Sequence, residues 1–329
     1  MFILANMNYL IFGSSGFIGT HLTNYIKNVN QEGIIYKYDI NTKVSEDYEV
    51  ADVRNVLKIN VPDTSQSIIY NLAAIHTTPG HQDNEYFETN VLGAENVCKF
   101  ARENNINTIV FTSSIAPYGP SEELKSETTI PMPNTPYGIS KLTAEYIHKV
   151  WQAEDPQNRK LIIVRPGVVF GQHEGGNYTR LYGSLKKGFF FYPGRKDTIK
   201  AAIYVKDVVR ILYEASINEA PGVLTLNLTY YPAPTIEAIC NTMAEVTNVS
   251  SPKLVVSGSS LKIVASVAYY AGRALGKKIN GIHPDRVKKL MVSTNILGQK
   301  LSQSPYKLQF TLKEAIADWY NDCNQKGLY

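Results

Sequence analysis

The sequence has few cysteines, no block of charge of one sign and no long uninterrupted run of apolar residues. Its three cysteines share no close spacing, which argues against a disulfide framework and is typical of a protein of the reducing cytoplasm. The net charge is only +4, with Lys and Arg spread along the chain, so no basic patch indicates nucleic-acid binding. What is present is an ordinary globular composition. With 44% hydrophobic residues, the 329 residues are enough for one large or two modest domains.

No membrane span is predicted. The most apolar later segment, residues 261–275, is shorter than the roughly 20 apolar residues that a spanning helix needs. It is interpreted as a core or interface helix, with a peripheral membrane contact as the alternative. The N-terminal stretch is apolar but has no basic leader and no small-residue cleavage site. We therefore predict no signal peptide, and both Met1 and Met7 are candidate starts.

Short apolar runs rich in Ile and Val alternate with helical patterns in the first half of the chain. Such runs are typical of strands buried on both faces of a parallel sheet. The predicted strands are 8–13, 33–39, 67–74, 107–114 and 160–167, and the predicted helices are 17–29, 84–104 and 136–152. This βαβ series predicts the α/β class with a doubly wound parallel sheet of the Rossmann type.

The second half changes character after Gly171, where Gly, aromatic and basic residues indicate loops that cover a cleft. Residues 201–215 are predicted to form a strand and a helix that return to the sheet. The rest is predicted to be mostly helical, and Thr311 with Glu314 forms a capping box before the last helix. We therefore expect a dinucleotide-binding domain made of residues 7–172 and 200–230, and a smaller, mostly helical substrate-binding part made of residues 173–199 and 231–329.

A glycine pattern lies between the first predicted strand and the first predicted helix. In "LIFGSSGFIGTHL" the residues Gly13, Gly16 and Gly19 follow the spacing G-x-x-G-x-x-G. Glycine is needed there because the chain turns tightly and a pyrophosphate must approach backbone N–H groups at a helix N-terminus. Asp39 lies 20 residues after Gly19, at the end of the second predicted strand. Its carboxylate can accept hydrogen bonds from both hydroxyls of the adenosine ribose and would repel a 2′-phosphate. This favours NAD over NADP; a simple strand-end turn residue is the alternative for Asp39.

Tyr137 and Lys141 are four residues apart in a predicted helix, so their side chains share one face. An isolated pair of this kind is usually part of a solvated surface helix. The surrounding motifs favour a catalytic role instead.

Six ordered motifs carry a resemblance to a known family. They are "DVR" at 52–54, "NLAA" at 71–74, "TNVLGAENV" at 89–97, "FTSSIAPYG" at 111–119, "YGISK" at 137–141 and "VRPGVVFG" at 164–171. With the glycine spacing, they make the chain resemble the extended short-chain dehydrogenase/reductases. More narrowly, the chain is similar to the NAD-dependent epimerase/dehydratase branch that acts on nucleotide sugars.

The resemblance implies a catalytic triad. Tyr137 would be the acid/base, Lys141 its partner, and Ser114 the hydroxyl that holds the substrate oxygen. A free tyrosine has a pKa of about 10, and an adjacent ammonium together with a nicotinamide cation would stabilise its phenolate. Lys141 would also hydrogen-bond the nicotinamide ribose.

The resemblance also implies where NAD and the substrate bind. Asp52 and Val53 would approach the adenine, and Asn90 would support the site, with a bond to nearby helix backbone as its alternative role. The expected cofactor-binding residues are Gly13, Ser15, Gly16, Phe17, Ile18, Gly19, Asp39, Asp52, Val53, Leu72, Ala73, Ala74, Asn90, Tyr137, Lys141, Pro166 and Val168. The expected substrate-binding residues are His76, Ser114, Asn177, Arg180, Arg195 and Lys200.

Some positions depart from the family pattern. Ile115 and Ala116 stand where 4,6-dehydratases carry carboxylates, which argues against water elimination. Val168 stands where many members have Asn, and Lys200 where many have Arg, so a point charge replaces a bidentate fork. The six histidines have no metal-ligand spacing, so no metal site is predicted, and His76 either faces the cleft or packs in a loop.

The implied function is an NAD-dependent nucleotide-sugar epimerase, acting at C4 through transient oxidation to a keto sugar. One alternative is a reductase of 4-keto-6-deoxy nucleotide sugars, which would use the same triad. A reductase of a non-nucleotide carbinol, such as a steroid or flavonoid, is a more distant one. A non-catalytic dinucleotide-binding scaffold is the alternative from another class. We expect a nucleotide-diphosphate sugar as the partner and a cytoplasmic homodimer as the assembly.

Overall fold

The computed structural model describes residues 7–40, 48–61, 64, 66–77, 80–257 and 291–329. The predicted core or interface helix at residues 261–275 and the candidate start Met1 lie outside these ranges. Within them, no helix is long and apolar enough to cross a membrane.

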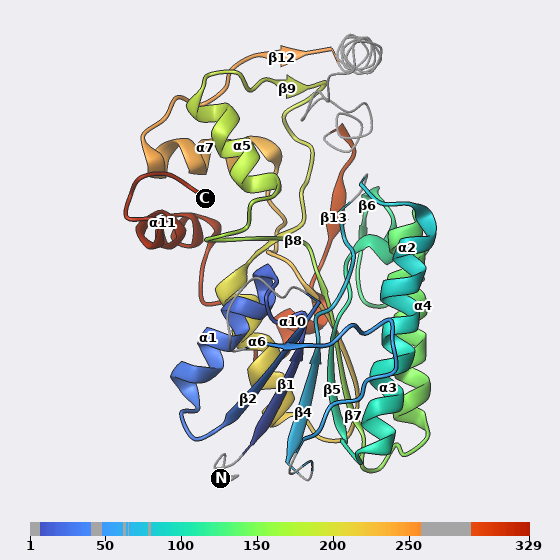
Figure 1. Cartoon of the computed structure of the whole chain (residues 1–329). Coiled ribbons are helices and arrows are strands. Elements are labelled where there is room, and N and C mark those ends of the chain that lie inside the picture. The colour runs from blue at the N-terminus through green and yellow to red at the C-terminus, as the bar shows by residue number, and fades with distance from the viewer. Residues whose placement is uncertain (1–6, 41–47, 62–63, 65, 78–79, 258–290) are drawn as a thin grey trace, which may run out of the picture.

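Seven parallel strands form the central sheet (Figure 1). In spatial order they are β3 (Glu49–Val50), β2 (Ile34–Asp39), β1 (Asn8–Phe12), β4 (Ser67–Asn71), β5 (Thr108–Thr112), β7 (Lys160–Pro166) and β11 (Gly222–Leu228). The chain begins in the middle at β1, winds outward through β2 and β3, and then winds the other way from β4 to β11. This doubly wound order places a ligand crevice at the carboxyl ends of β1 and β4, where the winding reverses.

Both faces of the sheet are buried, and β1 shows why. Its alternate residues Tyr9 and Ile11 belong to one core, whereas Leu10 and Phe12 belong to the other. Helices α1 (Phe17–Val29) and α6 (Val205–Asn218) cover the first face, and α3 (Gly93–Glu103) and α4 (Pro136–Ala153) cover the second. The continuous apolar strands of the sequence are therefore explained by burial on two sides.

The five predicted strands and the helices at 17–29 and 136–152 are confirmed. The helix predicted at 84–104 is divided into α2 (Asp83–Phe87), a π-helical turn η1 (Glu88–Leu92) and α3. The capping box of the last helix, α11 (Leu312–Asp322), is also confirmed.

One prediction about the sheet is wrong. β10 (Ala202–Tyr204) does not return to the main sheet; it pairs with β8 (Val168–Phe170) in a separate two-stranded sheet. Gly167 separates β7 from β8 and packs so closely on Ala201 that an added Cβ would lie 2.7 Å from the Ala201 carbonyl carbon. The strand that joins the main sheet is β11, which the sequence did not reveal.

The remaining elements lie beyond the carboxyl ends of the sheet strands (Figure 1). They are the 3₁₀ turn η2 (Ala116–Tyr118), β6 (Ser121–Lys125), α5 (Asn177–Lys186), β9 (Tyr192–Pro193), α7 (Ile236–Thr247), β12 (Val255–Val256), β13 (Thr294–Ile296), α10 (Gln299–Gln303) and α11. Parallel pairing joins β9 to β12 and β6 to β13, so the chain after residue 250 is tied back to earlier segments.

Candidate active site

The glycine loop between β1 and α1 has no room for side chains. Gly13 has a φ of +80°, and an added Cβ would lie 2.8 Å from the Ala73 nitrogen. A Cβ on Gly19 would lie 2.3 Å from the Gly13 oxygen. Gly16, the residue before α1, supplies no side-chain cap, so the positive end of the helix dipole faces the loop. This cradle fits the pyrophosphate of a dinucleotide.

Asp39 lies at the end of β2, beside the same loop. One of its carboxylate oxygens accepts a hydrogen bond from the Ser15 N–H at 3.0 Å, and the other accepts one from the Ile40 N–H at 2.8 Å. The carboxylate is thus held where the adenosine ribose of a bound NAD would lie. Phe17 and Ile18, also expected at the cofactor, begin α1.

Asp52 and Val53 lie at the predicted adenine side. Asp52 lines a cavity of about 200 Å³ beside β3, and its carboxylate pairs with Arg54 at 2.7 Å. Hydrogen bonds from Arg54 lower the pKa of Asp52. Val53 is buried against Gly93, where an added Cβ would lie 2.8 Å from the Val53 side chain. Leu72, Ala73 and Ala74 follow β4 directly, opposite the glycine loop.

The structure brings the three predicted catalytic residues together. Thr135 caps α4 by accepting a hydrogen bond from the Gly138 N–H, so the helix begins at Pro136 and presents Tyr137 in its first turn. Ser114 follows β5, and its side chain hydrogen-bonds that of Tyr137. Lys141 lies one turn further along α4 and is almost fully buried.

Burial shifts the pKa values of Tyr137 and Lys141 in opposite directions. Burial raises the pKa of Tyr137, and the hydrogen bond with Ser114 opposes that rise. Burial also lowers the pKa of Lys141 to about 7, against the attraction of Glu145. The Lys141 ammonium lies 4.3 Å from the centre of the Phe111 ring. The lysine charge is therefore easily lost, and a phenolate at Tyr137 needs a further positive charge.

Asn90 connects three segments around the site. It is buried in η1, accepts a hydrogen bond from the Ile75 N–H at 3.1 Å and donates to the Ile75 oxygen at 3.2 Å. It also donates to the Ser140 hydroxyl on α4 at 2.9 Å. A π-helical turn is frequent at functional sites. The hydrogen-bond partners of Asn90 thus lie outside its own helix, and its supporting role in the site stays a prediction.

A buried charged network behind the triad was not predicted. The Arg165 guanidinium donates to both carboxylate oxygens of Glu145, at 2.8 and 2.5 Å, and to the Tyr118 hydroxyl at 2.6 Å. Ser113 also donates to Glu145, at 2.6 Å. Glu145 is four residues after Lys141, as Lys141 is after Tyr137, so the helical spacing was a signal that could have revealed it.

The predicted substrate residues are in several places. His76 is close enough to Lys141 for that charge, together with burial, to lower its pKa. Asn177 and Arg180 bond each other at 3.0 Å on α5. Arg195 pairs with Glu122, and the Lys200 ammonium donates to the Val292 oxygen at 2.7 Å.

Burial lowers the pKa of Lys200 to about 8. Of the last two cofactor residues, the Pro166 oxygen accepts from the Ile115 N–H at 3.2 Å, and the Val168 N–H donates to Ala201. In the described part of the chain, Asn177, Arg180 and Arg195 form their hydrogen bonds with residues outside the triad.

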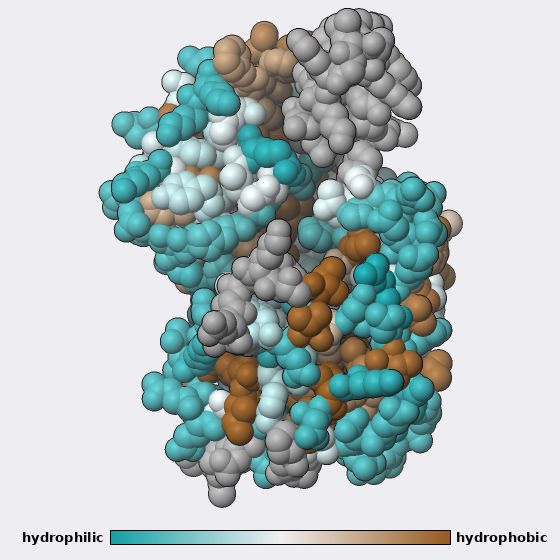
Figure 2. All heavy atoms as spheres, in the orientation of Figure 1, coloured by the Kyte–Doolittle hydropathy of each residue, from teal (hydrophilic) through white to brown (hydrophobic). Residues whose placement is uncertain are grey.

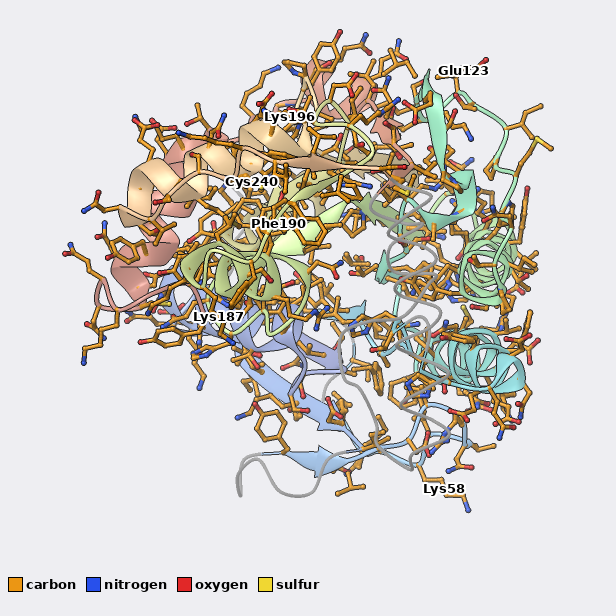
Figure 3. The ribbon with its side chains drawn as sticks, turned by 90° about the horizontal axis from the view of Figure 1, so that it is seen from above. Lys58, Glu123, Lys187, Phe190, Lys196 and Cys240 are labelled. Carbon is orange, nitrogen blue, oxygen red and sulfur yellow. The ribbon has the colours of Figure 1, made fainter. Side chains whose placement is uncertain are left out.

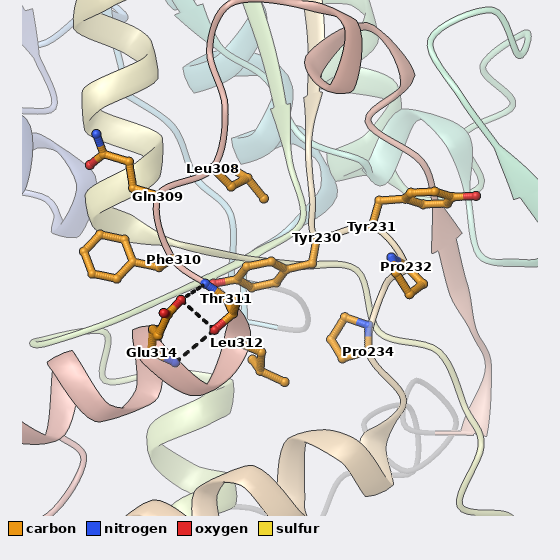
Figure 4. Close-up of a pocket in the computed structure, with 10 residues that line it drawn as sticks. All are labelled: Tyr230, Tyr231, Pro232, Pro234, Leu308, Gln309, Phe310, Thr311, Leu312 and Glu314. Atoms are coloured by element: carbon orange, nitrogen blue, oxygen red, sulfur yellow. Dashed lines mark hydrogen bonds between the residues drawn. The ribbon is translucent and has the colours of Figure 1, made fainter.

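A second hollow, of about 340 Å³, contains none of the predicted site residues (Figure 4). It is lined by Tyr230, Tyr231, Pro232, Pro234, Leu308, Gln309, Phe310, Thr311, Leu312 and Glu314. Glu314 is engaged there in the capping box with Thr311.

Comparison with known proteins gives a consistent match. Residues 9–224 match the model of the NAD dependent epimerase/dehydratase family. A protein of Escherichia coli O157:H7, N-acetyl-alpha-D-glucosaminyl-diphospho-ditrans,octacis-undecaprenol 4-epimerase, is 26% identical over 94% of this chain and 93% of its own. The UDP-glucose 4-epimerase of Vibrio cholerae is 28% identical over 54% of this chain and 57% of its own.

Solved structures agree in fold. MoeE5 in complex with UDP-glucose and NAD has a TM-score of 0.72 at 22% identity, covering 96% of this chain and 99% of its own. The UDP-N-acetylglucosamine 4-epimerase from Bacillus cereus has a TM-score of 0.72 at 18% identity, covering 98% of this chain and 100% of its own.

Proposed function

The chain belongs to the NAD dependent epimerase/dehydratase family, and from this membership we propose that it is an epimerase acting at C4 of a hexose carried on a nucleotide diphosphate. The observation that carries the proposal is the hydrogen-bonded pair of Ser114 and Tyr137 at the carboxyl end of β5. That edge of the sheet also carries the glycine cradle and Asp39, which fit NAD.

Tyr137 acts as the base that removes the proton of the C4 hydroxyl, and Ser114 holds the same oxygen by a hydrogen bond. Bound NAD supplies the hydride acceptor and, on return, the hydride donor. The hexose becomes a 4-keto sugar, turns over in the cleft and receives the hydride on its other face. Tyr137 then returns the proton, now as the acid.

Lys141 and the oxidised nicotinamide supply the positive charge that the Tyr137 phenolate needs. Burial opposes a charge on either side chain, so each alone is held near neutrality. A bound cofactor that brings a permanent positive charge would favour the phenolate. The base would then form when the site is loaded.

The rival functions are weaker on specific grounds. A dehydratase needs an acid and a base at C5 and C6, and Ile115 and Ala116 stand where its carboxylates would be. A reductase would use the same triad, but several of the matched relatives are named 4-epimerases. Two are named dehydrogenases, one of GDP-6-deoxy-D-talose and one of a sterol-4-alpha-carboxylate. A scaffold would not need Ser114, Tyr137 and Lys141 together.

A polyprenyl diphosphate is the second candidate carrier of the sugar. The E. coli relative named for such a carrier matches 94% of this chain, whereas the V. cholerae relative named for UDP-glucose matches 54%. The longer match includes the segments beyond the sheet, where the carrier would bind. Lys200, in place of the family's usual Arg, lies in those segments.

Incubation with candidate sugars in the absence of added reductant tests the function. UDP-glucose, UDP-N-acetylglucosamine and a short-chain polyprenyl diphosphate N-acetylglucosamine are supplied separately, and inversion at C4 is followed by proton NMR. We expect inversion of at least one alcohol with no net consumption of NAD. A separate incubation supplies a 4-keto nucleotide sugar together with NADH. Stoichiometric loss of NADH there, with no inversion of any alcohol, would instead identify a reductase.

We further propose that the protein is a cytoplasmic homodimer. Ile139, Tyr146 and Val150 are exposed on α4 at helical spacing, which gives an apolar stripe suited to a second copy of the helix. The three cysteines are buried and free, as in a reducing compartment. Light scattering after size exclusion should give twice the chain mass, and Val150→Glu should give a monomer.

A further inference from the structure

Hydrophobic side chains gather at the top of the molecule in Figure 2, where Figure 1 places β9 and β12. The residues are Phe189, Phe191, Leu254 and Val255, which we call the β9–β12 patch. Phe189 is 78% exposed and Leu254 is 62% exposed. Scattered surface hydrophobics are ordinary, but four on two paired segments form a patch that needs an explanation.

Burial alternates along residues 189–192, which lead into β9. Tyr192 is fully buried, and Phe190 packs edge-on against it. Phe189 and Phe191, between and before them, are exposed. The Tyr192 N–H donates to the Leu254 oxygen at 2.9 Å, which fixes Leu254 beside Phe191.

Three cations flank the patch along the chain. Lys186 and Lys187 at the end of α5, and Lys253 just before β12, are exposed. None of the three forms an ion pair within the residues that the structure describes. The acidic groups nearest to them in sequence have other partners: Asp197 pairs with Arg195 at 3.2 Å, and Glu245 pairs with Lys313 at 2.5 Å. Figure 3, seen from above, places Lys187, Phe190 and Lys196 on this lobe.

The charge of the described lysines indicates the sign of the partner. Lys186, Lys187 and Lys253 repel a positively charged surface and attract a negatively charged one.

We propose that the β9–β12 patch docks on the surface of an anionic lipid bilayer. Phe and Leu side chains ringed by lysines are the composition of interfacial membrane contacts, where the rings enter the headgroup boundary and the cations meet anionic lipids. This docking is linked to the proposed function through the second candidate substrate. A polyprenyl diphosphate sugar would be presented to the cleft at such a surface.

The test uses the full chain and vesicle co-sedimentation, which needs no enzymatic activity. Vesicles of pure phosphatidylcholine are compared with vesicles that contain roughly 30 mol% of the anionic lipid phosphatidylglycerol, whose negative surface potential attracts lysines. We expect binding to the anionic vesicles, at least about tenfold weaker binding to the neutral ones, and weakening by salt.

Two variants and a matched control locate the contact. F189S/L254S and K186Q/K187Q should each reduce vesicle binding by roughly tenfold or more. I130S/M132S removes two equally exposed apolar residues from the loop before α4 and should leave binding unchanged. Thermal unfolding and NAD titration of each variant check that the fold is intact.

Several results would overturn the proposal. These are no binding to anionic vesicles, equal loss in the control variant, or wild-type binding in both patch variants. Concentration-dependent self-association that F189S/L254S abolishes, without vesicle binding, would make the patch an interface between copies. Vesicle binding by a protein that inverts no sugar would leave the docking proposal standing and remove the proposed function alone.

Discussion

Lys141 lies against Phe111, with its ammonium 4.3 Å from the centre of the ring. The His148 ring stacks on the same Phe111 ring, with 4.2 Å between the ring centres. Burial lowers the pKa of His148 to about 4, so this histidine adds no charge at neutral pH. The lysine thus has an aromatic surface and a neutral neighbour, with Glu145 as the charge that favours its protonated form.

Tyr137→Phe should retain NAD binding and lose turnover by about 10² to 10⁴, because only the proton-transfer group is removed. The measurement is C4 inversion by NMR, with NAD affinity by calorimetry. Tyr231→Phe, on an exposed ring in the second hollow, is the control and should turn over normally. Near-normal turnover by Tyr137→Phe would remove Tyr137 from the mechanism.

Lys141→Met should abolish activity and change the pH dependence of stability. The pKa of Lys141 is about 7 in the folded protein, below its ordinary 10.5. Burying this lysine therefore lowers the free energy of unfolding by its full amount below pH 7, where both states are protonated, and by nothing above pH 10.5, where both are neutral. The variant should therefore unfold at higher urea than the wild type at pH 6. We expect this advantage to shrink as the pH rises from 7 to 10. If the difference in urea midpoint between the variant and the wild type stayed constant across that range, the pKa of Lys141 would not be lowered in the folded protein.

Asp39 should make NAD bind more tightly than NADP by tenfold or more, about 1.4 kcal/mol, because its carboxylate meets the 2′-phosphate. Asp39→Asn keeps the shape of the side chain but removes its charge, so it should reduce the ratio of NAD affinity to NADP affinity. Calorimetric titration with both cofactors measures it. A wild-type preference for NADP would show that Asp39 does not face the ribose.

Glu145→Gln should destabilise the fold by about 3 to 5 kcal/mol, because it leaves the buried Arg165 guanidinium without an opposite charge. Glu154→Gln is the matched control: Glu154 also bonds two arginines, but it is 40% exposed, so its loss should cost about 1 kcal/mol or less. Urea unfolding of the two variants should separate them clearly. Equal urea midpoints for the two variants would mean that the buried network of Glu145 and Arg165 contributes little to the free energy of unfolding.

Gly19→Ala should weaken NAD binding by at least roughly 10²-fold, about 2.7 kcal/mol. The new Cβ would meet backbone atoms of Gly13 and Ser14 that hold the loop. Gly183→Ala tests the opposite case, since nothing lies within 4 Å of its Cβ position on α5. That control should stabilise the protein by about 0.5 to 1 kcal/mol and leave NAD binding unchanged. Similar NAD affinity in both variants would remove the glycine loop from the cofactor site.

Local patterns were enough to predict most of the sheet and its helices. β1 and β4 are unbroken apolar runs because both of their faces are buried, and α4 has a proline start with a threonine cap. β11 was missed because it alternates apolar residues with Thr225 and Asn227. Asn227 is buried for a tertiary reason: its side chain bonds Tyr118 and the Leu297 oxygen, far away in sequence.

The predicted triad depended on spacing within one helix and on the end of one strand, and the structure places its members together. The partners of Arg165 could not be predicted in the same way. Glu145 and Tyr118 lie 20 and 47 residues away, and only packing of α4 against β7 brings them to the guanidinium. Likewise, Arg195 was expected at the substrate, but the structure shows it bonded to Glu122 and Ser293.

The π-helical turn at Glu88–Leu92 has a consequence for how this region tolerates insertions and deletions. Each residue of a regular helix advances the side chains by about 100°. The extra residue in a π turn therefore shifts the direction of the side chains that follow it. Because of this shift, Asn90 faces Ile75 and Ser140, while Val97 and Ala101 of α3 still face the core. Removing one residue here would restore ordinary helical geometry but rotate one of these two faces out of place. The length of this segment is thus as tightly constrained as its composition.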